Sequence, residues 1–366
     1  MGDTVTKEQL KLAVERVYAT DKFEYVDAEF VDTAEGRKLV IMTKAKSWGP
    51  NYLNFGFSAE SDFTHKSTID IDVAYIQSDI SPYGGMWLNE MKLGLESVLL
   101  SEWYQPLDEV QHYFARANIK FARDIWGSMR DRSQLTNKYF QTKLGTGYNY
   151  SNDGAIEIGF IGEKGEIAFQ DDRRASLDYD SLGAYFTFDY DSLNSINFPT
   201  QGQKISVDVF WRNDNYQAAV GIPPKDKSVV INLDWRGAFH IKNHAFVGLS
   251  SFSTTSSDAD FSIHITDLGG FLNLSGYQKD ALIGYHKAFA AVMYQYDLGR
   301  EFFNSANSPL YLGVSLEAGN VWNQKDNVSL DDLIYAGSLY LGIDTSVGPA
   351  AFGFGASDDG EKTVFL

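Results

Sequence analysis

The chain has 366 residues and no cysteine, and its 49 Asp and Glu against 31 Lys and Arg give a formal net charge of −18. This acidity argues against a nucleic-acid partner, which would be expected to meet a basic surface. The lack of cysteine excludes disulfides, a thiol nucleophile and cysteine-ligated metals. Aromatic residues reach 14% although mean hydropathy is −0.26. That combination is typical of transmembrane β-barrels, whose strands have one apolar and one polar face.

Convincing helical periodicity occurs once, close to the N-terminus. Thr6 and Gln9 form a capping box. The apolar face that follows carries Leu10, Val14 and Val17. Two short extended stretches come next, 23–31 and 38–43, separated by a turn. This α-β-β unit ends near residue 46 and is too small to be stable alone.

From residue 51 onward the apolar residues recur with a period of two. The apolar face of these predicted strands includes Leu53, Phe55, Phe57, Ala59, Ile69, Ile71, Val73, Tyr75, Ile205, Val207, Val209, Trp211, Val229, Ile231, Leu233, Trp235, Leu310, Leu312, Val314, Leu316, Leu339, Leu341 and Ile343. Alternation alone would also suit a soluble sandwich or barrel. No stretch approaches the roughly 18 consecutive apolar residues of a transmembrane helix.

Three features of this pattern favour a membrane barrel. Several runs reach the roughly 9 to 11 residues that a tilted membrane-crossing strand needs. The polar face is strongly charged, which suits a water-filled lumen better than a dry core. Aromatic residues also gather near predicted strand ends, as interfacial girdles require. These are Trp87, Trp103, Tyr104, Trp126, Trp211 and Trp322.

Short and long connections alternate along the barrel segment. Residues 242–244 and 347–349 suit tight periplasmic turns, whereas 212–228, 256–284 and 323–336 suit long external loops. The pattern predicts about sixteen strands, an even number. The last strand would begin at Val364 and be truncated. The seam between first and last strands would then be formed by Tyr52, Leu53, Phe55, Val364, Phe365 and Leu366.

The motifs in the sequence give little support for an enzymatic function. The Asp-Gly of 152–155 lacks the partner G-x-S-x-G of a lipase dyad, and it is typical of a hairpin turn. The six histidines show no metal-binding spacing. Asp70 and Asp72 share one strand face and could bind a cation, although a charged lumen wall explains them better. We therefore expect no catalytic residues, no metal and no cofactor in this chain.

The segment "LGGFLNLSGYQ", residues 268–278, is not a phosphate loop, because it has no GK[ST] ending and no following helix. Its glycines instead allow a sharp reversal and close backbone packing. A second motif, Phe198, Pro199 and Gly202, gives a turn just before a long alternating strand.

In this order, the segments resemble the POTRA-plus-barrel proteins of outer membranes (the bacterial surface antigen family). "KEQLKLAVERVYATDKFEYVDAEF" resembles the second helix and second strand of a POTRA domain, with Asp21-Lys22 replacing its usual glycine. Trp48, Gly49 and Pro50 resemble the junction to the barrel. "FPTQGQKISV" is similar to the F-P-x-x-G strand start of the family, and "LGGFLNLSGY" to its sixth-loop motif.

The sixth-loop motif narrows the resemblance. Assembly insertases and two-partner transporters carry arginine in [V/I/L]-R-G-[F/Y], where this chain has Ser275. The serine form, with "MWLNEM" and "WYQPLDE", is similar to the patatin-like autotransporters of type Vd secretion. The resemblance implies that the loop folds into the barrel through Gly269, Gly270, Leu274, Ser275, Gly276 and Tyr277. With serine in place of arginine, hydrogen bonds and packing would hold it.

The implied organisation is a partial POTRA domain at 1–46 and a barrel at 47–366. The fold class is thus all-β, a transmembrane antiparallel barrel preceded by a partial α/β domain. The implied function is the display of an N-terminal phospholipase passenger from the outer membrane, with the POTRA part in the periplasm. The implied partners are membrane lipids, the passenger, the barrel-assembly machinery and a possible second copy. An assembly or two-partner transporter and a passive pore are the alternatives.

Overall fold

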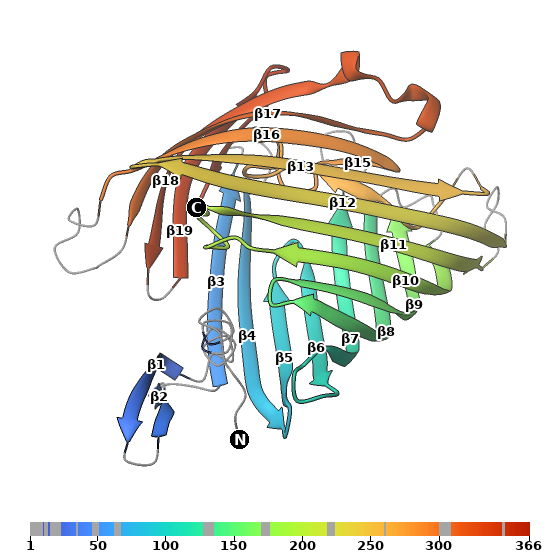
Figure 1. Ribbon diagram of the computed structural model, residues 1–366. Coiled ribbons are helices and arrows are strands. Elements are labelled where there is room, and N and C mark those ends of the chain that lie inside the picture. The colour runs from blue at the N-terminus through green and yellow to red at the C-terminus, as the bar shows by residue number, and fades with distance from the viewer. Residues whose placement is uncertain are drawn as a thin grey trace.

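A computed structural model describes Leu10, Val14 and residues 23–33, 36–45, 51–61, 67–126, 135–169, 176–217, 224–259, 261–299, 309–345 and 348–366. Sixteen antiparallel strands close into a barrel (Figure 1). The barrel closes where β20 pairs with β3. This confirms the predicted all-β barrel of about sixteen strands. The barrel strands are β3 Asn51–Ser61, β4 Ser67–Ser81, β5 Gly84–Leu93, β6 Ser97–Pro106, β7 Tyr113–Trp126, β8 Leu135–Ser151, β9 Gly154–Phe169, β10 Leu177–Asp191, β11 Gly202–Tyr216, β12 Lys225–Ile241, β13 His244–Ser257, β16 His286–Asp297, β17 Leu310–Trp322, β18 Ile334–Thr345, β19 Gly348–Ser357 and β20 Lys362–Phe365.

The alternating pattern places apolar side chains outside and polar ones inside. Leu53, Phe55 and Phe57 are more than half exposed on the outer face. The interior instead buries carboxylates such as Glu157 and Glu317. Because successive side chains of a strand point to opposite faces, a period of two produces both surfaces at once. No helix within the described ranges is long and apolar enough to cross a membrane.

Strands β11 and β12 are longer than predicted, so the loop between them is shorter. β11 continues to Tyr216 and β12 begins at Lys225, so that most of the predicted loop 212–228 is paired strand. The loop 323–336 contains two short 3-10 turns, Lys325–Asn327 and Leu330–Asp332, before β18 begins. Polar residues can belong to these strands because the barrel interior accepts polar and charged side chains.

The predicted aromatic girdle is only partly right. Trp87 and Trp103 lie exposed on the outer face as a cross-strand pair, with ring centroids 6.4 Å apart. Trp211 is also exposed, but it lies well inside β11 rather than at its end. Trp322 is buried at the end of β17, where its backbone packs against Gly284 of the inner loop. Sequence position alone could not reveal that this loop covers Trp322.

The N-terminal part is described in pieces. β1 (Phe23–Thr33) and β2 (Gly36–Ala45) form an antiparallel hairpin, and Leu10 and Val14 are helical. The other residues that the sequence singled out here lie outside the described residues. They are Thr6, Gln9, Val17, Trp48, Gly49 and Pro50. The assignment of a POTRA domain therefore remains a prediction.

Candidate functional site

The loop between β13 and β16 folds back onto the inner wall. The loop contains β14 (Thr266–Leu268), which pairs with β15 (Leu282–Gly284) further along the chain. Between them the chain reverses at Gly269 and Gly270, whose φ angles of 137° and 109° suit glycine. A Cβ at Gly269 would lie 2.2 Å from the carbonyl oxygen of Gln278. The reversal therefore requires glycine at this position.

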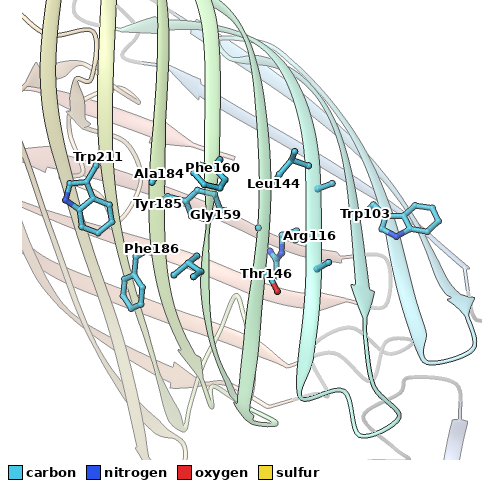
Figure 2. Close-up of a pocket in the computed structure, with 14 residues that line it drawn as sticks. Trp103, Arg116, Leu144, Thr146, Gly159, Phe160, Ala184, Tyr185, Phe186 and Trp211 are labelled. Carbon is cyan, nitrogen blue, oxygen red and sulfur yellow. The ribbon is translucent and has the colours of Figure 1, made fainter.

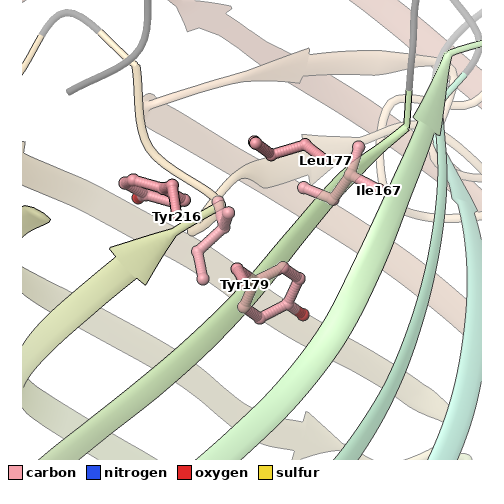
Figure 3. Packing of buried hydrophobic residues seen from close by; sticks show 5 residues of the cluster. Ile167, Leu177, Tyr179 and Tyr216 are labelled. Atoms are coloured by element: carbon pink, nitrogen blue, oxygen red, sulfur yellow. The ribbon is translucent and has the colours of Figure 1, made fainter. Parts of the chain in front are cut away.

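The base of the loop is held by an apolar cluster on the wall. Ile263 of the loop packs with Ile167 of β9 and with Leu177, Tyr179 and Tyr216 of the neighbouring strands. Figure 3 shows four of these wall residues meeting from adjacent strands. The next residue, His264, lies 3.1 Å through Nε2 from an Asp214 carboxylate oxygen. These contacts fix the position at which the loop enters the barrel interior.

Ser275 is fully buried at the tip and bonds to Glu317 on β17. Its backbone N–H donates to Glu317 Oε2 at 2.6 Å, and its hydroxyl donates to Oε1 at 2.8 Å. Ser315 donates to the same Oε1 at 2.5 Å. These three donors provide hydrogen bonds to both oxygens of the buried Glu317 carboxyl group.

Gly276 brings the loop backbone into contact with the end of the barrel sheet. Its φ is 108°, and a Cβ here would lie 2.7 Å from the backbone nitrogen of Ser357 on β19. Its carbonyl oxygen accepts a 2.6 Å hydrogen bond from Thr363 on β20. Beside it, the Tyr277 hydroxyl donates to Asp359 in the β19–β20 turn. These contacts tie the tip to the last two strands.

Lys279 ties the other side of the tip to the first strands. Its Nζ lies 2.7 Å from Glu96 Oε2, in the β5–β6 connection, and its backbone N–H donates to Glu60 of β3 at 2.9 Å. Lys92 contacts the same Glu96 oxygen at 2.6 Å. Burial alone would raise the pKa of Glu96, but hydrogen bonds from the two ammonium groups outweigh it and lower the pKa to about 2. The two ammonium groups therefore favour the ionised form of Glu96.

A pair of buried carboxyl groups lies beside this ion pair. Burial and, next to it, the nearby charge of Asp267 together raise the pKa of Asp280 to about 8. Burial likewise raises the pKa of Asp267. One oxygen of Asp280 is buried without a hydrogen-bond partner among the described residues. Two carboxyl groups this close resist losing both protons.

The seam between β20 and β3 is the shortest strand pairing in the barrel. Only Val364 and Phe365 are in register with β3, opposite Ser61 and Glu60. One further reciprocal pair of backbone hydrogen bonds, 2.7 and 2.8 Å long, joins Ala59 and Leu366. By contrast, β18 and β19 are in register at ten positions, 336–345 against 348–357. Residues 53–58 of β3 have no partner strand on this side among the described residues.

Of the predicted seam residues, Val364 and Phe365 are in register with β3, and Leu366 is hydrogen-bonded to Ala59. Tyr52, Leu53 and Phe55 lie on β3 in register with β4, and their place at the seam stays a prediction. β20 also begins at Lys362, two residues earlier than expected. Antiparallel strands run in opposite directions, so the start of the last strand meets the end of the first. That geometry, applied to the sequence, would have identified Ala59, Glu60 and Ser61.

The strand-start motif lies elsewhere on the inner wall. Phe198 is buried and stacks on Tyr311, with ring centroids 5.1 Å apart. Gly342 leaves room for the Phe198 ring, since a Cβ there would lie 2.3 Å from it. Gly202 has φ 98° and packs on Ser192, and Pro199 is buried. The motif thus anchors the β10–β11 connection to β17 and β18.

A hollow on the outer wall has the character of a lipid-facing surface. It measures about 750 Å³ and lies over β6 to β11. Figure 2 shows Trp103 and Trp211 at its two sides, with Leu144 and Phe160 between them. Elsewhere, no group of three or more His, Asp or Glu in the described ranges could hold a metal ion. The inner loop and the seam are therefore the candidate functional site.

Comparison with known proteins identifies the fold. No family model and no curated protein matches the sequence. BamA from Haemophilus ducreyi lacking POTRA domains 1-3 is similar over 100% of this chain and 79% of its own, with a TM-score of 0.68 and 12% identity. CdiB from Acinetobacter baumannii (TM-score 0.64, 10% identity, 100% and 68% covered) and CdiB from Escherichia coli (0.62, 11%, 100% and 72%) are also similar. The chain has the fold of these barrels.

Proposed function

We propose that this chain is a protein-transporting barrel of the outer membrane, and that it serves as translocator and anchor of a patatin-like (type Vd) autotransporter. The observation that carries the proposal is the inner loop, which docks on the lumenal wall through Ser275 and meets both β3, at Glu60, and β20, at Thr363.

The edge of β3 that faces the seam can bind another strand. On the side that faces β20, residues 53–58 have no strand partner among the described residues, and such a strand edge is a template for the addition of another strand. Leu53, Phe55 and Phe57 beside this edge are exposed on the outer face. A passenger segment in transit would pair with this edge before it leaves the barrel. The inner loop occupies part of the lumen, which favours transport through a regulated seam over a passive pore.

Two kinds of likeness support the wider assignment. The similarity to BamA and to both CdiB proteins supports a transporter barrel of the POTRA-plus-barrel superfamily. The serine form of the loop motif supports the autotransporter branch rather than an assembly or two-partner transporter. In this proposal the phospholipase passenger and the POTRA part precede the barrel, and the latter lies in the periplasm.

A disulfide across the seam tests the proposal. Ala59→Cys with Leu366→Cys introduces the only two thiols of the chain, at a hydrogen-bonded pair whose spacing suits a disulfide. Oxidation should abolish surface display of the upstream passenger, and reduction should restore it. The matched control is Leu312→Cys with Leu341→Cys across the long β17–β18 junction. Unchanged display in the oxidised seam variant would refute a transporting seam.

A further inference from the structure

We propose that the outer face of β5 and β6 is a docking surface for a second copy of this chain, with the Asn89 amide at its centre. The inference does not rest on the proposed transport function. It rests on a hydrogen-bonded polar group that faces the membrane from within an apolar wall. Because hydrocarbon offers polar groups no partner, a polar group that is left incomplete there indicates contact with another protein surface.

Asn89 and Ser101 face outward from the barrel. On β5, Asn89 alternates with Trp87 and Met91, which are both exposed on the outer face. Ser101 of β6 is directly opposite Asn89 in register, so it lies on the same face of the sheet. The two polar side chains therefore lie among lipid-facing ones.

Three side chains form a hydrogen-bond chain that runs in one direction. The Trp87 indole N–H donates to Ser101 Oγ at 2.9 Å, and the Ser101 hydroxyl donates to Asn89 Oδ1 at 3.0 Å. The chain ends at the Asn89 amide nitrogen, which has two N–H groups to donate. Neither N–H group has an acceptor among the described residues.

The unpaired amide lies about halfway across the hydrocarbon. β5 and β6 have 10 residues each, which is the length that a tilted strand needs to cross it. Asn89 is the sixth residue of β5, and Ser101 is the fifth residue of β6. Water and the ester groups of lipids lie at the membrane interfaces, so neither reaches an amide at this depth. The missing acceptor must come from protein.

A second copy of the chain supplies this acceptor. An amide oxygen can accept two hydrogen bonds, and Ser101 provides only one to Asn89 Oδ1. Two Asn89 side chains that meet across a two-fold axis can therefore exchange two reciprocal N–H···O bonds. Such an isologous contact uses the same patch on both copies. A carboxylate on a different partner would instead bring a charge into the hydrocarbon, which is costly.

The wall beside the amide is shaped for contact with another protein surface. A hollow of about 470 Å³ opens next to Asn89 and Ser101, and Tyr75, Met91 and Leu99 contribute to its lining. Close packing drives the association of membrane-embedded surfaces, because lipid tails are as apolar as the side chains themselves. Side chains of the second copy that enter this hollow add packing to the two amide bonds.

Self-association of the full chain in a bilayer tests the proposal. Copies that carry a donor or an acceptor dye at the N-terminus are reconstituted in vesicles of dioleoylphosphatidylcholine, and energy transfer between them is followed as lipid is added. Asn89→Leu should weaken the association about tenfold, the scale of polar contacts between membrane-embedded surfaces. Ser101→Ala should weaken it less, because the amide remains and only the donor that orients it is lost.

Thr146→Val is the matched control for these variants. Thr146 alternates with the exposed Leu144 on the outer face of β8, but its hydroxyl already donates to the carbonyl oxygen of Phe114 at 2.9 Å. Removing this hydroxyl should leave the association unchanged. Heat-modifiable migration in detergent gels shows that each variant has formed its barrel before it is compared.

Chemical crosslinking locates the contact on the wall. Met91→Cys introduces the only thiol of the chain, next to Asn89 on the same outer face. A bis-maleimide should link two copies of this variant in vesicles, and adding Asn89→Leu should lower the yield. Leu144→Cys, on the outer face of β8, should give little linked product.

Two results would overturn the proposal. Equal association of the wild type and of Asn89→Leu would mean that the amide does not meet a second copy. A wild-type chain that stays monomeric in vesicles at every lipid ratio would assign the acceptor to a different protein.

Discussion

Ser275 gives both its backbone N–H and its hydroxyl to the carboxylate of Glu317, at 2.6 and 2.8 Å. The two residues are 42 positions apart, and both are buried. A serine thus holds the loop tip by neutral donors at the position where the resembled insertases and two-partner transporters carry arginine. One carboxylate on β17 accepts both hydrogen bonds of Ser275.

Ser275→Ala should loosen the loop tip. The backbone donor remains, but Glu317 Oε1 loses one hydrogen bond in a buried site, which costs about 1–3 kcal/mol. Hydrogen exchange of residues 270–280 should therefore accelerate by at least fivefold. Ser206→Ala, which removes a hydroxyl bonded to Asp189 between two wall strands, is the matched control. Equal exchange in the two variants would contradict the assigned role of Ser275.

Gly276→Ala should undock the tip more severely. The added Cβ would lie 2.7 Å from the Ser357 nitrogen, and φ of 108° is strained for alanine. Protease should then cut within 270–280 in the folded barrel. Gly162→Ala is the control, because a Cβ there meets no atom closer than 3.4 Å. Protection of the loop in Gly276→Ala would show that the close approach is not required.

Docking of the loop should weaken as the solution becomes alkaline. The pKa of Asp280 rises from 3.8 to about 8 on burial, so the docked loop holds a proton that the free loop releases. Docking is therefore fully favoured below about pH 4 and loses this contribution as the pH rises through about 8. The charged and titratable groups around Asp280 and its partner are Glu96, Lys92, Asp267, Lys279, Lys287 and Asp124.

Asp280→Asn should remove this pH dependence, since an amide does not titrate. The measurement is hydrogen exchange of residues 270–280 between pH 5 and 9, corrected for the intrinsic effect of pH on exchange. Wild type should lose protection toward pH 9, whereas the variant should keep it. The same pH profile in both proteins would assign the titration to another group.

Leu316→Lys should destabilise the barrel in a bilayer. Leu316 is 77% exposed on the outer face of β17, and a lysine on a lipid-facing wall costs about 2–4 kcal/mol near the membrane centre. Leu330→Lys is the matched control, because Leu330 is 78% exposed but lies in the turn before β18. Denaturant unfolding in vesicles should separate the two. Equal stability would mean that the outer face does not meet lipid.

Local patterns in the sequence predicted the barrel strands but not which residues meet where the barrel closes. Alternation placed Leu53 outside, and the Asp-Gly of 152–155 correctly indicated the β8–β9 hairpin. The contacts of Lys279 were not predictable, because Glu96 and Glu60 lie 183 and 219 positions away. Local periodicity predicts on which face of a strand a residue lies. It does not predict which distant residue lies opposite it in the closed barrel.

The central claim is that a polypeptide in transit meets the open edge of β3. The most direct measurement is photo-crosslinking from benzoyl-phenylalanine at Phe55, beside the unpaired edge, during secretion of the passenger. Phe160 on β9 is the control, since it is equally outward-facing but lies in a strand paired on both sides. We expect a covalent adduct with the passenger from Phe55 and none from Phe160. No adduct from Phe55, or equal adducts from both positions, would contradict transport through the seam.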